Sequence, residues 1–135
     1  MAAMNNLARI IEGCMSRFET DGQGNMSARF VFPGDFLGFQ GHFPDNPVLP
    51  GVCMVQAALV MAGKWAGRPG ELKSLVMAKW FAPTGPGAEL DFLVRVSPNG
   101  AGGTKLKTKI TRGGDKVAEL ILAVQGLNSA RVGCL

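Results

Sequence analysis

The feature that most constrains the fold is the stretch from residue 51 to residue 66, where apolar side chains cover most sides of a helical pattern. One face alone carries Val52, Val55, Leu59, Ala62 and Ala66. A helix that is apolar nearly all round is typically buried, so this segment is expected to be a central helix that the rest of the chain surrounds. Glycine and proline at 67–70 then predict its end.

The chain after this helix has the pattern of β-structure. Four strand-like segments, 75–80, 89–96, 104–111 and 117–124, are separated by turns rich in glycine and proline. Along 104–111 the lysines 105, 107 and 109 alternate with Leu106, Thr108 and Ile110, which predicts one solvated and one buried face. We therefore expect an α+β fold in which an antiparallel meander wraps one long apolar helix.

The chain before this helix is expected to add a helix, a strand and a loop. Leu7, Ile10, Ile11, Cys14 and Phe18 recur at helical spacing and predict a short N-terminal helix. Alternation over 26–32 predicts a half-buried strand. The segment 36–50 is rich in proline and phenylalanine and has neither period, which indicates an ordered loop.

Composition limits the class of protein. A length of 135 residues fits one domain, 1–135. The net charge of +4 has none of the clustered cations that mark a nucleic-acid surface, so no nucleic-acid partner is expected, although an acidic partner would suit it. No apolar run reaches the ~18 residues of a membrane span, and no signal sequence is recognisable, which favours a cytoplasmic protein. Three cysteines without nearby histidine argue against disulfides and metal sites.

Few side chains in this sequence can act as an acid or a base near neutral pH. His42 is the single histidine, and the chain has no tyrosine. The prolines around His42 would stiffen its loop enough to aim the ring. Pro50 and Gly51 stand where the central helix is expected to begin, and backbone N–H groups at a helix start can bind a developing negative charge.

These residues lie in motifs that resemble a known family. Gly41-His42-Phe43-Pro44, Asn46-Pro47 and Leu49-Pro50-Gly51-Val52 are similar to the signature of the hotdog-fold 3-hydroxyacyl-[acyl-carrier-protein] dehydratases of fatty acid synthesis. The segment 79–83, the Pro86-Gly87 turn and the segment 114–119 continue the resemblance, which covers about residues 26–126.

The resemblance implies a hotdog domain that works as a dimer, with active sites between subunits. It assigns His42 as the base and the Gly51 amide as the group that polarises the thioester carbonyl. The expected substrate is tethered to acyl carrier protein or coenzyme A, and no metal or other cofactor is implied. Arg68, Lys73 and Lys79 are candidates for contacts with an acidic carrier.

One position departs from the family. Relatives carry Glu or Asp five residues after the glycine, where this chain has Gln56. Glutamine binds a hydroxyl or a water but has no proton to lend near pH 7. Either His42 also protonates the leaving hydroxyl while Gln56 holds it, or Gln56 is inert in a chain that binds acyl groups without chemistry.

Other residues are weaker candidates. Phe43, Pro50, Val52 and Cys53 are expected to contact the substrate. For Cys53 a place in the core competes with a thiol activated by the helix start. Asp45 is an alternative acid or an ordinary turn residue. Met54, Met61 and Met77 line an acyl tunnel or belong to the core.

Three functions remain open at this point. The first is a 3-hydroxyacyl-thioester dehydratase of fatty acid or polyene synthesis. The second is a non-catalytic carrier-binding chain or a subunit of a hetero-dimer whose paralogous partner supplies the carboxylate. The third is a hotdog thioesterase, in which Gln56 orients a water that attacks a thioester held at Gly51.

Overall fold

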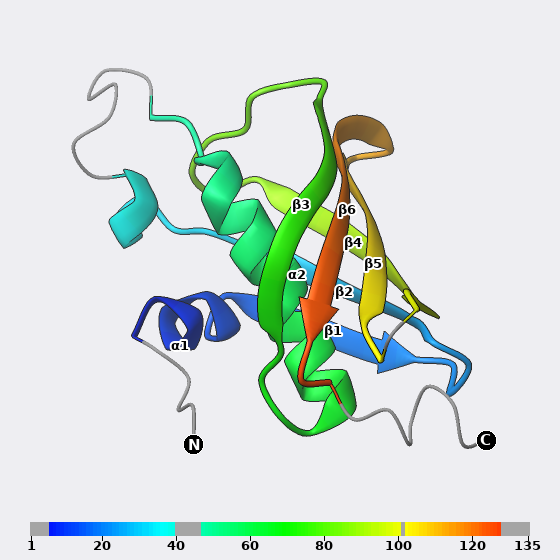
Figure 1. Ribbon diagram of the computed structural model, residues 1–135. Helices are drawn as coiled ribbons and strands as arrows, with labels where there is room; N and C mark the ends of the chain where they lie inside the picture. The colour runs from blue at the N-terminus through cyan, green and yellow to red at the C-terminus, as the bar shows by residue number, and fades with distance from the viewer. Residues whose placement is uncertain (1–5, 40–46, 101, 128–135) are drawn as a thin grey trace.

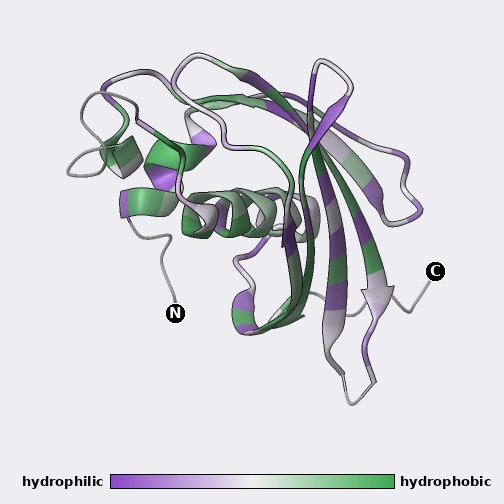
Figure 2. Ribbon diagram, turned by 90° about the horizontal axis from the view of Figure 1, so that it is seen from above, coloured by the Kyte–Doolittle hydropathy of each residue, from purple (hydrophilic) through white to green (hydrophobic). Residues whose placement is uncertain are grey.

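A computed structural model describes residues 6–39, 47–100 and 102–127. In chain order the elements are α1 (Asn6–Glu12), β1 (Met15–Thr20), β2 (Asn25–Val31), the short 3-10 helix η1 (Leu37–Phe39), α2 (Gly51–Ala66), β3 (Glu71–Trp80), β4 (Glu89–Pro98), β5 (Thr104–Arg112) and β6 (Asp115–Gln125) (Figure 1). The six strands form one antiparallel sheet in the order β1-β2-β4-β5-β6-β3. Seen from above, this sheet curves around α2 (Figure 2). The expected α+β architecture, a sheet wrapped around one long apolar helix, is thus confirmed.

The core lies between α2 and the concave face of the sheet. Ten of the sixteen residues of α2 are buried. They meet inward-facing side chains of the strands, among them Phe30, Phe92, Leu106 and Ile110. Lys107 and Lys109 are exposed on the other face of β5, as the alternation predicts. Burial on most sides explains why the sequence of α2 has no broad polar face.

The N-terminal prediction is partly wrong, because the helix ends at Glu12 and the chain continues as strand β1. Gly13 donates to the carbonyl of Arg9 and Cys14 to that of Ile11, which closes the helix. The β1–β2 register shifts between Ser16 and Glu19, and Arg17 has a positive φ of 57°. This bulge leaves Met15 and Phe18 as the half-buried residues of β1, a spacing of three that resembles a helix.

The expected meander of the last four strands also needs correction. Strands β4, β5 and β6 follow one another in the sheet, but β3 pairs with β6 and not with β4. The strand also begins at Glu71, earlier than the predicted residue 75. As a result β3 is an edge strand, and the chain must cross from it to the far side of β5 to enter β4.

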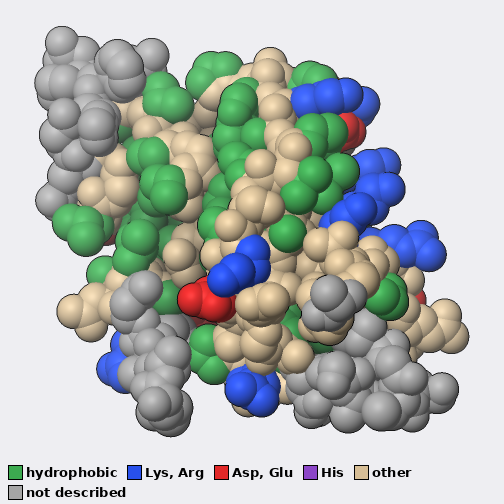
Figure 3. Space-filling model, viewed as in Figure 1, with side chains coloured by type: hydrophobic (Ala, Val, Ile, Leu, Met, Phe, Trp, Pro, Cys, Tyr) green, Lys and Arg blue, Asp and Glu red, His purple; other side chains and the backbone are tan. Residues whose placement is uncertain are grey.

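The edge strand β3 is unusually apolar for its exposure. Most of its side chains are exposed, including the large apolar residues Leu72, Leu75, Val76 and Trp80. Figure 3 shows hydrophobic side chains gathered on this face of the molecule. An apolar edge with unpaired backbone groups is a surface that natural proteins normally cover. Among the described residues, no helix is long and apolar enough to cross a membrane.

Candidate functional site

The start of α2 carries free backbone donors. Pro50 precedes the helix in an extended conformation, with φ −66° and ψ 146°, and no side chain caps the helix. The Cys53 N–H bonds the Pro50 carbonyl at 3.0 Å, which leaves the Gly51 and Val52 N–H groups without an intrahelical acceptor. Leu49, just before, is fixed by a 2.8 Å bond from its N–H to the Thr84 carbonyl. The donors therefore have a defined position at the positive end of the helix dipole.

An apolar hollow opens beside these donors. We call it the start hollow; it measures about 480 Å³ and is lined mainly by Leu49, Gly51, Met54, Trp80 and Phe81. The Trp80 indole lies directly against Gly51: a Cβ at residue 51 would be 2.7 Å from its Cη2 atom and 2.8 Å from its Cζ2 atom. Any side chain at position 51 would have to displace this indole, so packing favours glycine there independently of any substrate.

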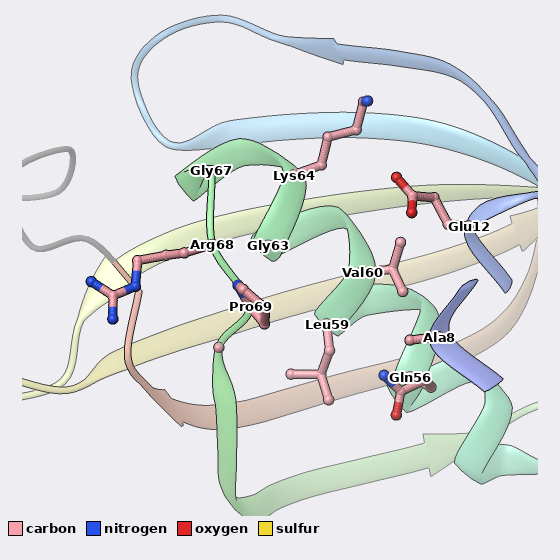
Figure 4. Close-up of a pocket in the computed structure, with 11 residues that line it drawn as sticks. Ala8, Glu12, Gln56, Leu59, Val60, Gly63, Lys64, Gly67, Arg68 and Pro69 are labelled. Carbon is pink, nitrogen blue, oxygen red and sulfur yellow. The ribbon is translucent and has the colours of Figure 1, made fainter. Parts of the chain in front are cut away.

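Gln56 lies in a second hollow. This Gln56 hollow measures about 300 Å³ and runs along α2 between α1 and the turn after α2. Its main lining residues are Ala8, Glu12, Gln56, Leu59, Val60 and Gly63. Figure 4 shows Gln56 at one end, while Lys64 and Arg68 extend outward near the other end.

Gly51 and Gln56 therefore face different spaces. Five residues of an α-helix turn by about 500°, so their side-chain directions differ by about 140°. The residues of α2 that are not buried are Gly51, Val52, Gln56, Leu59, Gly63 and Lys64, and four of them form one stripe: Val52, Gln56, Leu59 and Gly63. Val52 is 66% exposed at the start of that stripe. The stripe is a helix face that α1 and the turn after α2 cover only in part.

The other candidates have different surroundings. Cys53 is buried, with its sulfur close to Gly38, and burial raises the pKa of its thiol. Burial thus opposes an acidic thiol, and Cys53 is part of the hydrophobic core. Met54 lines the start hollow, whereas Met61 is fully buried in the core.

Several predicted residues cannot be placed. His42, Phe43 and Asp45 lie outside the described residues, so their roles stay predictions. Within the described ranges, no group of three or more His, Cys, Asp or Glu side chains is arranged to hold a metal ion.

Two residues at these hollows were missed by sequence reasoning. Trp80 is 51% exposed and yet packs on Gly51. In the sequence Trp80 ends a strand pattern and belongs to the segment 79–83 that resembles the family, but neither feature indicates its contact with residue 51. Glu12 lines the Gln56 hollow from α1, and its helix–helix contact has no sequence signal either.

Comparisons with known proteins give the family. Residues 18–119 match the model of the ApeI-like family, which is described as ApeI dehydratase. The 3-hydroxyacyl-[acyl-carrier-protein] dehydratase FabZ of Brucella abortus (strain S19) is 36% identical over 93 residues, 63% of this chain and 59% of that protein. FabZ of Thermoanaerobacter sp. (strain X514) is 33% identical over 87 residues, 59% of this chain and 61% of that protein. The chain thus spans less than two thirds of the length of these curated relatives.

Solved structures give the fold. The structure described as the dehydratase heterocomplex ApeI:P from Xenorhabdus doucetiae contains a chain with a TM-score of 0.72 at 19% identity, which covers 83% of this chain and 96% of that one. The E. coli PaaI protein has a TM-score of 0.62 at 13% identity, over 81% of each chain. The sheet wrapped around α2 is therefore the hotdog fold, and the family expected from the motifs is confirmed. The chain belongs to the ApeI-like family of hotdog-fold dehydratases.

Proposed function

We propose that this chain is a subunit of a 3-hydroxyacyl-thioester dehydratase whose active site forms between two hotdog chains. The observation that carries the proposal is the pair of free N–H groups at the start of α2, held at the edge of an apolar hollow. Loss of water from a 3-hydroxyacyl thioester passes through an enolate-like state, and fixed amide donors stabilise that charge.

The proposed steps use three groups. His42 removes the proton from the α-carbon while the Gly51 N–H donates a hydrogen bond to the thioester oxygen, on which negative charge develops. The bond from the β-carbon to the hydroxyl then breaks, and a double bond forms between the α- and β-carbons. Protonated His42 gives the same proton to the departing hydroxyl, which leaves as water, while the Gln56 amide holds that hydroxyl through hydrogen bonds.

The geometry of α2 supports a site made by two chains. Gly51 and Gln56 open into different hollows of one protomer, so one small substrate cannot touch both from the same helix. A second chain brings its own Gln56 toward the start hollow of the first. The partly exposed stripe on α2 and the apolar edge strand β3 are the surfaces that such a partner would bury.

A hetero-dimer is the arrangement that Gln56 favours. Loss of a positioned acid typically costs ~10²- to 10⁴-fold in rate, and a paralogous chain with a carboxylate at that position would restore it. The related structure titled as a heterocomplex of ApeI and a second chain is consistent with such pairing. Arg68, at the rim of the Gln56 hollow, and the exposed Lys79, next to Trp80, would meet an acidic acyl carrier protein.

The test is an assay of the purified chain, alone and with any co-encoded hotdog chain, on 2-enoyl thioesters of pantetheine and of acyl carrier protein. Hydration, followed by the loss of enoyl absorbance, is expected without release of free thiol. Free thiol would show the thioesterase instead. Binding of the acyl carrier without either reaction, in both assemblies, would show a non-catalytic subunit.

A prediction at Gly51 separates packing from substrate binding. Gly51→Val is expected to weaken binding of an acyl-thioester analogue by ~10-fold or more, because its side chain displaces the indole and crowds the N–H groups. Isothermal titration calorimetry measures the affinity. The control is Gly51→Val combined with Trp80→Ala, which removes the collision with the indole and keeps the crowding. Recovery of wild-type affinity in the double variant would mean that Gly51 serves packing alone.

A further inference from the structure

Trp80 is the side chain that closes the start hollow over Gly51. It ends β3, and its ring atoms Cη2 and Cζ2 lie so near the Gly51 Cα that not even a methyl group fits between them. The indole is nevertheless 51% exposed, so only part of the ring is engaged in this contact. A half-exposed tryptophan packed on a helix start is a costly use of a large apolar surface unless something else covers it.

The neighbours of Trp80 are held in place. The Phe81 N–H bonds the Val117 carbonyl at 2.9 Å, and the Lys116 ammonium lies 5.3 Å from the centre of the Phe81 ring. On the other side, the bond between Leu49 and Thr84 fixes the chain before α2. The backbone of Trp80 therefore has a defined position, and the exposed part of its indole borders the start hollow.

The indole lies against Gly51 and lines the same hollow, so it would border the α-carbon of a thioester held at the Gly51 N–H. An oxygen that accepts a hydrogen bond from the Gly51 N–H lies about 2.9 Å from that nitrogen, and the α-carbon is two bonds further on. The acyl chain then continues into the start hollow. A substituent on the α-carbon would need space at the wall formed by the indole, whereas an unbranched chain would not.

We propose that Trp80 is a specificity-determining residue that restricts the site to acyl thioesters without a substituent on the α-carbon. This inference rests on the proposed function, because it places the thioester carbonyl at the Gly51 N–H. It goes further by naming the substrate class and the wall that selects it. One additional methyl group at a packed apolar wall typically changes selectivity by ~10- to 200-fold.

The first arm of the test measures kcat/KM for hydration of 2-butenoyl-pantetheine and of 2-methyl-2-butenoyl-pantetheine. Because the two compounds differ in intrinsic reactivity, the result is the change in their ratio between variants. Trp80→Ala is expected to shift the ratio toward the branched compound by ~10-fold or more, and Trp80→Phe by less. Leu93→Ala, which removes an exposed apolar side chain of β4 outside both hollows, is the matched control and should leave the ratio within about twofold of the wild type. An unchanged ratio in Trp80→Ala would overturn the proposal.

The second arm needs no catalysis. It uses butyryl- and 2-methylbutyryl-pantetheine analogues in which a methylene replaces the thioester sulfur. In a Trp65→Phe background Trp80 is the single tryptophan, so its emission should change when the butyryl analogue binds. Calorimetry on the wild type repeats the comparison without that substitution in the core. The branched analogue is expected to bind ~10-fold or more weaker, and Trp80→Ala should remove that difference.

The two arms separate the possible failures. Absence of hydration together with selective binding of the unbranched analogue would contradict the proposed reaction and support the role of Trp80. Hydration with equal binding of both analogues, or with no change in Trp80 emission, would leave the reaction standing and overturn the role of Trp80. Failure of both analogues to bind would overturn the placement of the acyl group beside Trp80.

Discussion

Replacement of His42 by alanine is expected to lower kcat/KM for hydration of a 2-enoyl thioester by at least ~10²-fold, the usual effect of losing a positioned base. In the proposed steps His42 carries out both proton transfers, and the chain has no other histidine and no tyrosine to replace it. Phe39 and Leu49, described residues on either side of His42 in the sequence, are both buried. The fold is therefore expected to survive the substitution.

The measurement combines steady-state kinetics with thermal unfolding and size-exclusion chromatography. The melting temperature and the oligomeric state are expected to stay near those of the wild type, so that the lost rate reports chemistry. Added imidazole should restore part of the activity, since it can enter the space left by the side chain and act as the base. Near wild-type turnover in the alanine variant would remove His42 from the mechanism.

The sequence was sufficient to predict the helices and strands whose apolar residues follow a single clear periodicity. Residues 51–66 form the buried central helix because their apolar pattern leaves no other arrangement, and β4, β5 and β6 match the predicted segments closely. The prediction failed where the spacing of apolar residues in a strand resembles the spacing in a helix, as it does in β1. The bulge at Arg17 gives β1 a spacing of three between its half-buried residues, which no pattern can distinguish from one turn of helix.

The position of β3 and the role of Trp80 depend on contacts distant in sequence. Pairing of β3 with β6 joins residues about 40 to 50 positions apart, and no local pattern specifies which strand is the neighbour. The same holds for Trp80 and Gly51. The motif around Gly51 was informative about chemistry, but it gave a substrate-based reason for glycine where the structure shows a second reason in the indole.

Gln56→Glu is the substitution expected to raise activity, because it introduces a carboxyl group at the position where the resemblance to the dehydratases implies one. The two side chains have nearly the same size, and Gln56 already lies partly exposed in a hollow, so the change requires no repacking. In the homodimer the rate of hydration should increase by ~10-fold or more if part of the general-acid effect returns. A smaller gain is expected in a hetero-dimer whose other chain already supplies the acid.

The pH profile gives an independent reading of the same variant. In the proposed site the carboxylate of Gln56→Glu would lie close to His42, and a neighbouring negative charge favours the protonated imidazole. Because the base must be deprotonated to act, the rise of activity with pH should move to higher pH in Gln56→Glu. Val52→Glu adds the same charge one turn earlier on the stripe of α2 and is the matched control: it should produce neither the gain nor the same shift.

A loss of activity in Gln56→Glu, instead of a gain, would also identify the role of Gln56. If Gln56 is adapted to hold the leaving hydroxyl of this chain's own substrate, a carboxylate there would lower activity, and Gln56→Ala would lower it as well, since both variants lose the amide donor. Equal activity in the glutamate, alanine and wild-type proteins would mean that residue 56 does not touch the substrate. The carboxylate would then have to come from the other chain of a hetero-dimer. Substitution of the carboxylate residue in the partner should abolish the activity, although substitutions at position 56 of this chain leave it unchanged.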